Sequence, residues 1–177
     1  MTDTPIKPYI MPGECIVFSG LDAIFCPEKE IAFDQIAHES FEINAVEESL
    51  KYIDEKIMEI VTGFPFSKFR LQDLAIIVSE AVNNAITNGP QSTDRKIWVD
   101  ILYLPRIMLY VFVRDDLGQL KIEDINMGIP DTFATDESGR GYLIMATLST
   151  ILAYIPGYGN RLKEIAIGLE PDLKEES

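Results

Sequence analysis

Residues 80–89 read EAVNNAITNG and close the most regular helical pattern in the chain, which we expect to extend from about residue 67 to about residue 87. Apolar residues recur there at helical spacing and predict one buried stripe: Leu71, Leu74, Ala75, Val78, Val82 and Ala85. Glu80 and Asn84 lie one turn apart on the opposite side, flanked by two isoleucines. The helix is therefore apolar nearly all round, and such helices are usually covered on both faces.

A carboxylate and an amide on a covered helix face need partners, because burying them unpaired costs free energy. A ligand-filled cleft would supply partners for Glu80 and Asn84, and the alternative is a solvated polar face. The amides that follow favour the cleft, since oxygen atoms at a helix C-terminus can hold a hard cation such as Mg²⁺.

The segment before this helix predicts a strand and another helix. Phe41 and Ile43 alternate with polar neighbours as a short strand does. We expect Asn44 and Glu47 to open the next helix with a capping box, and Gly63 to end it in the left-handed conformation.

The segments after the central helix predict the rest of the fold. Two alternating strands at residues 96–104 and 106–114 are joined by a short link, which makes them antiparallel neighbours. A helix over residues 141–153 and a strand over residues 164–169 close the pattern. We therefore expect an α+β fold, a two-layer α/β sandwich with helices on one face of a mostly antiparallel sheet.

The domain organisation follows from where the regular pattern begins. We expect residues 1–39 to be an N-terminal extension, residues 40–170 the main domain and residues 171–177 a solvated acidic tail. The extension is too apolar for a disordered tail, so we expect it either to add strands to the sheet edge or to form a homodimer contact.

Composition excludes several classes of function. The chain has 177 residues, 29 acidic against 15 basic, and a net charge of −14. This charge excludes generic nucleic-acid binding, disfavours anionic membranes and favours basic protein partners. Two cysteines outside any CxxC pair and a single histidine exclude thiolate or multi-histidine metal sites. No long apolar run or basic leader segment is present, so we expect a cytoplasmic location.

A glycine-rich segment at residues 138–141 has the features of a binding site for a polyanion. Residues 115–140 have no sustained periodicity, and a loop of this length inside a domain is usually functional. The loop ends in a glycine-rich turn that opens a helix, where free N–H groups suit a triphosphate. An acidic chain can bind such a group only through local neutralisation by N–H groups or a metal ion.

The stretch at residues 80–89 resembles the N-box EAVxNA(I/V)xHG of GHKL (Bergerat-fold) ATPases, most closely that of their anti-sigma-factor serine-kinase branch. The resemblance covers about residues 40–169. It implies that Asn84 coordinates Mg²⁺ and that Glu80 acts as general base. Asn88, where the family has histidine, and Gly89 would line the cofactor site.

Residues 111–119, VFVRDDLGQ, resemble the G1 box, a strand ending in DxGxG whose aspartate accepts the adenine amino group. Counting from the strand assigns this role to Asp115, and counting D-x-G assigns it to Asp116, with Gly118 as the glycine. Gln119 replaces the second glycine of the box.

Residues 138–145, SGRGYLIM, are similar to the G2 box, which implies that Ser138, Gly139 and Gly141 approach the triphosphate. Arg140 would reach either a phosphate or solvent. The intervening residues 119–138 would form the ATP lid.

The resemblance implies a Mg·ATP-dependent protein serine kinase that is an anti-sigma factor, binding a sigma factor or phosphorylating a STAS-domain anti-anti-sigma partner. The alternative is a nucleotide-binding or degenerate module that sequesters a protein partner without catalysis. A third hypothesis, a sensor histidine kinase fragment, rests on His38–Glu39, but residues 40–43 predict a strand where that motif needs a long helix.

Overall fold

The computed structural model describes residues 9–11, 15–19, 37–64, 66–87, 92–104, 108–116, 140–155 and 163–172. The elements in chain order are β1 (Tyr9–Met11), β2 (Cys15–Ser19), β3 (Ala37–Ala45), α2 (Ser49–Val61), α3 (Lys68–Thr87), β4 (Ser92–Leu104), β5 (Met108–Asp115), α4 (Arg140–Leu148), β6 (Ile151–Ile155) and β7 (Lys163–Leu169).

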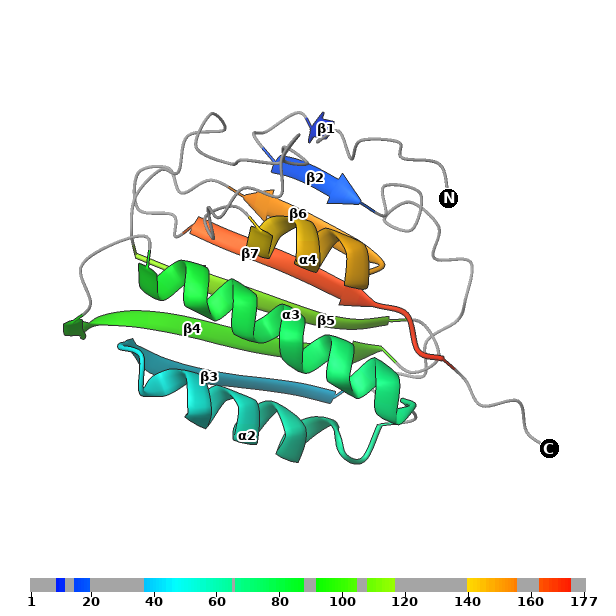
Figure 1. Cartoon of the computed structure of the whole chain (residues 1–177), viewed down its shortest axis with the longest axis horizontal. Helices are drawn as coiled ribbons and strands as arrows, with labels where there is room; N and C mark the ends of the chain where they lie inside the picture. Colours follow the sequence, from blue (N-terminus) through cyan, green and yellow to red (C-terminus); the bar gives the residue numbers. More distant parts are fainter. Residues whose placement is uncertain are drawn as a thin grey trace.

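The strands form one sheet in the order β1-β2-β6-β7-β5-β4-β3, and every neighbouring pair is antiparallel. Helices α2, α3 and α4 lie on the same face of this sheet (Figure 1). The fold is therefore the two-layer α/β sandwich that the order of elements predicts. Among the described residues, no helix has the length and apolar character needed to cross a bilayer.

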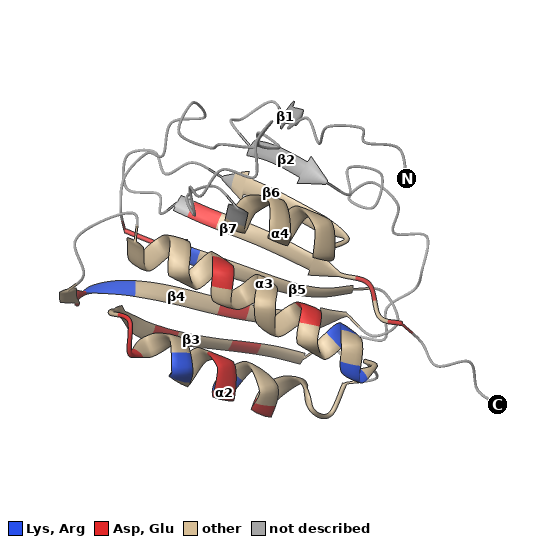
Figure 2. Ribbon diagram, viewed as in Figure 1, with Lys and Arg blue, Asp and Glu red and all other residues tan. Residues whose placement is uncertain are grey.

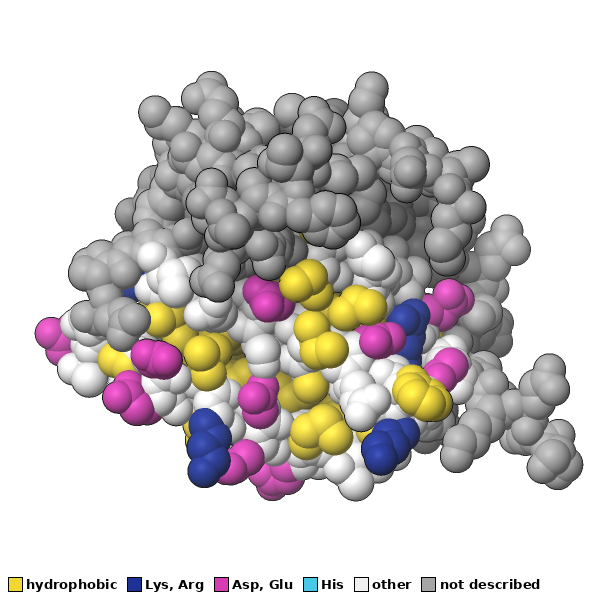
Figure 3. All heavy atoms as spheres, viewed as in Figure 1, with side chains coloured by type: hydrophobic (Ala, Val, Ile, Leu, Met, Phe, Trp, Pro, Cys, Tyr) yellow, Lys and Arg dark blue, Asp and Glu magenta, His cyan; other side chains and the backbone are white. Residues whose placement is uncertain are grey.

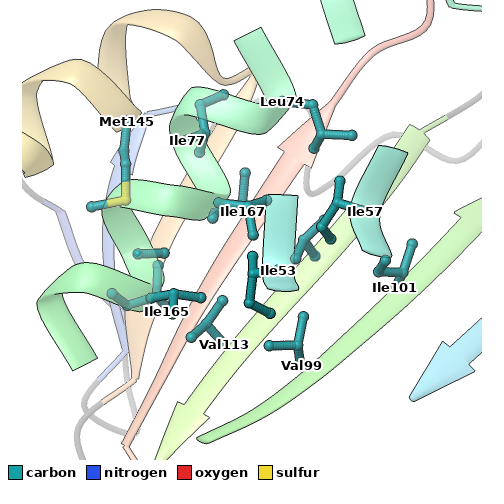
Figure 4. Packing of buried hydrophobic residues seen from close by; sticks show 14 of the residues in the cluster. Ile53, Ile57, Leu74, Ile77, Val99, Ile101, Val113, Met145, Ile165 and Ile167 are labelled. Atoms are coloured by element: carbon teal, nitrogen blue, oxygen red, sulfur yellow. The ribbon is translucent and has the colours of Figure 1, made fainter. Parts of the chain in front are cut away.

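The core fills the space between the helices and the sheet. Side chains from both layers point toward one another there (Figure 4): Ile53 and Ile57 of α2, Leu74 and Ile77 of α3, Met145 of α4, and Val99, Ile101, Val113, Ile165 and Ile167 of the strands. Each is at most 4% exposed. Burial of one such side chain contributes roughly 1.5–3 kcal/mol, so this shared core fixes α3 over the middle of the sheet.

The start and end of α2 differ from the prediction. The capping box is wrong, because Asn44 still belongs to β3 and its Oδ1 accepts a hydrogen bond of 2.8 Å from Lys96 Nζ. Glu48 is the N-cap residue and makes no side-chain capping bond. The left-handed ending at Gly63 is also wrong: Thr62 ends the helix in the right-handed conformation, and a tight turn follows in which Phe64 N–H donates to Val61 O.

Helix α4 is shorter than predicted, because residues 151–153 belong to strand β6 and not to the helix. The main chain turns at Thr150, whose N–H donates to Gly168 O of β7 at 2.8 Å. Strand β6 then pairs with β7 on one side and with β2 on the other. Its residues 151–154 are all buried, so the sequence shows a continuous apolar run that periodicity cannot tell from a helix.

Strands β1 and β2 extend the sheet beyond β6. Val17 of β2 lies opposite Ala153 of β6, so the described part of the N-terminal extension adds strands to the sheet edge. At the other edge, β3 begins at Ala37, slightly before the boundary expected at residue 40. The homodimer contact stays a prediction.

Candidate functional site

Glu80, Asn84 and Gly141 meet where α4 begins against α3. The two helices pack side by side, and α4 starts at Arg140 (Figure 1). A Cβ atom placed on Gly141 would lie 2.8 Å from Glu80 Oε2 and 3.3 Å from Asn84 Nδ2. Only a glycine allows this approach without displacing the neighbouring side chains. The first turn of α4 therefore brings its main chain directly against both polar side chains of α3.

The surroundings of Glu80 and Asn84 agree only in part with a helix covered on both faces. The sheet, α2 and α4 cover most of α3, and Ile77 is fully buried. Ile76, however, is 46% exposed, one turn before Glu80. Glu80 and Asn84 themselves are half-buried. The two polar groups thus lie at the border between the covered and the open part of α3.

The side chain of Asn84 has a buried hydrogen-bond donor. Its Nδ2 atom is inaccessible to solvent and makes no hydrogen bond within the described part of the chain. Leaving such a group unpaired costs about 1–3 kcal/mol, and a phosphate oxygen would satisfy it. The amide oxygen of Asn84 and the carboxylate of Glu80 are the kinds of ligand that Mg²⁺ prefers.

These donors fit a metal ion that is shared with a ligand. Among the described residues, no group of three or more His, Cys, Asp or Glu side chains could hold a metal ion. Mg²⁺ commonly binds through one or two protein oxygens, with phosphates and waters completing its coordination. The residues present therefore suit a Mg–nucleotide complex better than a bare ion.

The two aspartates at the end of β5 occupy different environments. Asp115 is 2% exposed and continues the helix-facing row that contains Val111 and Val113. Asp116 is exposed, and its Oδ1 lies 3.6 Å from Arg95 Nε. Only Asp115 therefore faces the helix layer in which Glu80 lies.

Tyr142 is a buried residue that follows Gly141 and lies near Asp115. It lies on α4 and is 7% exposed. Burial raises the pKa of its hydroxyl to about 12, and the negative charge of Asp115 adds to this shift. The electrostatic interaction shows that α4 places Tyr142 near the buried carboxylate of β5. Sequence reasoning did not single out this tyrosine, although its place directly after the second glycine of GRG is a signal that could have done so.

Several predicted site residues lie outside the described residues: Asn88, Gly89, Gly118, Ser138 and Gly139, together with the lid over residues 119–138. Arg140 begins α4, but its side chain is not among those described. The part of the site that the structure describes consists of Glu80, Asn84, Asp115, Gly141 and Tyr142. Their proposed roles stay predictions.

The opposite face of the sheet carries a different arrangement. His38, Asp100, Arg114 and Glu164 lie on β3, β4, β5 and β7, four neighbouring strands. Arg114 forms ion pairs with Asp100 and Glu164, and His38 lies beside Asp100. Together with two apolar side chains they line a shallow hollow of about 570 Å³. His38 lies within a strand, so the long helix that a histidine kinase phosphoacceptor needs is not formed there.

Comparisons with known proteins identify a similar fold. No family model matches the chain, and no curated protein matches it in sequence. A solved structure of "the RsbU and RsbW domains of Rv1364c from Mycobacterium tuberculosis" is similar, with a TM-score of 0.56 and 13% identity. The match covers 76% of this chain and 32% of that one, so the chain spans about a third of its length. The chain shares its fold with part of that structure.

Proposed function

We propose that the chain is a Mg·ATP-dependent protein serine kinase that acts as an anti-sigma factor. The observation that carries this proposal is the convergence of Glu80, Asn84 and Gly141, in which a glycine main chain meets a carboxylate and a buried amide donor. These are the residues that the GHKL resemblance assigns to catalysis, metal binding and phosphate approach. They come from two motifs far apart in the sequence, so their meeting supports a common site.

The chemistry would be mainly positioning. Asn84 would hold Mg²⁺ through its amide oxygen and donate its Nδ2 hydrogen to a phosphate oxygen. Mg²⁺, when bound, supplies the charge neutralisation that phosphoryl transfer requires. Glu80 would accept the proton of the attacking serine hydroxyl, and the first turn of α4 would offer N–H groups to the phosphates. Asp115, the buried aspartate, would accept the adenine amino group.

A protein acceptor is supported by the exposed surface of α3, the helix that carries Glu80. Apolar side chains gather over the helix layer and are interspersed with acidic ones (Figure 3). Phe69 is 78% exposed and Ile76 46% exposed, two turns apart on α3. Large exposed apolar side chains are typical of protein contact surfaces. The net charge of −14 favours a basic partner, such as a sigma factor, or a STAS-domain protein with a basic face.

The test is phosphorylation of a STAS-domain protein from the same organism, incubated with the chain and Mg·ATP and read as phosphoserine by mass spectrometry. Glu80→Gln should slow transfer by roughly 10²–10⁴-fold, because a positioned base contributes about that factor. Glu55→Gln is the matched control, since Glu55 is an exposed carboxylate of α2 that pairs with Lys51. Transfer by Glu80→Gln at the wild-type rate would contradict the assignment.

The second candidate is a module that captures a partner without catalysis. Gln119 in place of the second G1 glycine favours it, because that glycine lets the backbone come close to the nucleotide. Thermal shifts with Mg·ATP, measured for the wild type and Asn84→Ala, separate the candidates. Equal shifts, or no shift in either protein, would remove every model in which nucleotide controls the chain.

A further inference from the structure

Arg95 is a buried charged residue beneath the C-terminal end of α3. It lies on β4, is 8% exposed, and continues the helix-facing row whose next member is Ile97. Its Nη2 atom donates a hydrogen bond of 2.9 Å to Ala85 O, and its Nε atom lies 3.6 Å from Asp116 Oδ1. One guanidinium therefore connects β4, the last turn of α3 and the end of β5.

Both partners of Arg95 are sequence neighbours of proposed site residues. Ala85 follows Asn84, and Asp116 follows Asp115. The last four carbonyl groups of a helix have no partner within it, so Ala85 O depends on an external donor. A cation at a helix C-terminus is also favoured by the helix dipole. Arg95 thus stabilises the turn of α3 that presents Asn84.

The strand is irregular at this place. Asn44 pairs with Lys96 and Ala45 pairs with Ser92, so residues 93–95 of β4 have no opposite number on β3. Such bulges are frequent near functional sites, where they redirect a side chain. In Figure 2, basic positions lie at the start of β4, below the end of α3. The bulge therefore includes Arg95, the residue through which β4 bonds the end of α3.

We propose that Arg95 is a positioning residue of the nucleotide site, which sets the distance between Asn84 and Asp115. The inference rests on the proposed function, since these two side chains would contact opposite ends of ATP. Loss of the bridge leaves each end of the site formed but frees one to move against the other. A ligand that spans both ends then loses affinity, whereas a ligand that uses only one end does not.

The experiment compares Mg·ATP with adenosine, which has the base but no phosphates. Arg95→Met should raise the Kd for Mg·ATP by about tenfold or more and change the Kd for adenosine less than about threefold. Arg95→Lys keeps the charge but cannot hold Ala85 O and Asp116 together, so it should restore only part of the affinity. Asp116→Asn should weaken Mg·ATP and spare adenosine; loss of adenosine binding would show Asp116 to be the adenine contact and overturn the proposal.

Arg70→Met is the matched control. Arg70 lies at the N-terminal end of α3 and also donates to a helix carbonyl, Leu148 O at the end of α4. The substitution should lower the free energy of unfolding and leave the Kd for Mg·ATP unchanged. Equal weakening of Mg·ATP and adenosine by Arg95→Met, or none, would overturn the inference. If Arg95→Met does not fold, Arg95→Lys and Asp116→Asn carry the same comparison. Failure of the wild type to bind Mg·ATP would instead refute the proposed function, and this inference with it.

Discussion

The two ends of α3 are each held by an arginine, but they differ in what remains unbonded. At the N-terminal end, Arg70 donates to Leu148 O at 3.2 Å, to Thr150 Oγ1 at 3.3 Å and to Glu170 O at 3.2 Å. Ser67 Oγ caps the helix by accepting from Arg70 N–H. Each of these groups of the N-terminal end has its partner inside the chain.

At the C-terminal end, Arg95 bonds the main chain of α3, yet the nearby Asn84 Nδ2 is buried and has no hydrogen-bond partner among the described residues. Proteins that satisfy local rules elsewhere tend to break them at functional sites. The comparison teaches that the polar groups at the N-terminal end of α3 bond one another and stabilise the fold, whereas the C-terminal end, where we propose that the nucleotide binds, keeps an unpaired donor. Substitutions at the two ends should therefore change different measured quantities.

The largest effect is expected at the C-terminal end. Gly141→Ala places a Cβ atom 2.8 Å from Glu80 Oε2, so the carboxylate must swing away. Phosphoryl transfer should fall by about 10²-fold or more, because small displacements of reacting groups are costly. The melting temperature should change little, since Oε2 is the free end of a flexible side chain.

Gly63→Ala is the control for that substitution, because a Cβ there would meet nothing within 4 Å. It should leave both transfer and stability unchanged. Wild-type transfer by Gly141→Ala would remove the distinction between the two ends of α3.

Arg70→Met tests the N-terminal end. The substitution removes charge-assisted bonds to two carbonyl groups and one hydroxyl, so unfolding should become easier by about 2 kcal/mol in urea denaturation. Nucleotide affinity of the folded protein should not change. Lys68→Met is the control, because Lys68 is exposed and lies two residues before Arg70. It should lower the free energy of unfolding by less than about 0.5 kcal/mol. A loss of affinity in Arg70→Met would show that the two ends are coupled.

The contribution of Tyr142 to stability depends on pH. Its pKa is about 12 in the folded chain against an ordinary value of 10.0, so the unfolded chain releases this proton first as pH rises. Stability contributed by the protonated tyrosine is complete below pH 10 and is lost as pH rises toward 12. Between pH 8 and pH 11, the wild type should lose about 1.4 kcal/mol more than Tyr142→Phe in urea unfolding. Equal losses would contradict the burial of this hydroxyl beside Asp115.

The smallest effect is expected at Asp172, beside the N-terminal end. Partial desolvation opposes the shift, but hydrogen bonds from Ser67 lower the pKa of this carboxyl below its ordinary 3.8. Its contribution is therefore present above pH 4 and is lost as pH falls through the lowered pKa. Asp172→Ala should cost about 0.5 kcal/mol at pH 7, because the group is exposed, and progressively less as pH falls through the lowered pKa. A cost that does not decrease with falling pH would point to a contact other than the carboxylate.

Much of the fold could be predicted from the sequence, because its elements are long and strongly periodic. Helix α3 begins and ends within a residue of its predicted bounds. The errors occurred where a tertiary contact outweighs a local signal: Asn44 bonds Lys96 instead of capping α2, and strand pairing on both sides converts an apolar run into β6.

The candidate site could be predicted only as far as its motifs are contiguous. Helical spacing indicates Glu80 and Asn84, the glycine-rich turn indicates Gly141, and the GHKL resemblance implies that they share a site; the structure brings them together. Arg95 could not be predicted, because a single arginine at the start of a strand has no pattern. Its hydrogen bond to Ala85 O forms only when α3 packs over β4.

The ion pairs on the sheet face opposite the helices make the two faces of the sheet respond differently to ionic strength. His38 lies 3.7 Å from Asp100, and Arg114 bridges Asp100 and Glu164 across neighbouring strands. Partly exposed pairs of this kind are worth about 0–1 kcal/mol each and are screened by added salt, whereas the buried hydrogen bond from Arg95 to Ala85 O is screened much less. Raising the salt concentration would therefore weaken these side-chain ion pairs more than the buried hydrogen bond beneath α3. Salt thus offers a way to perturb one face of this sheet without changing a residue.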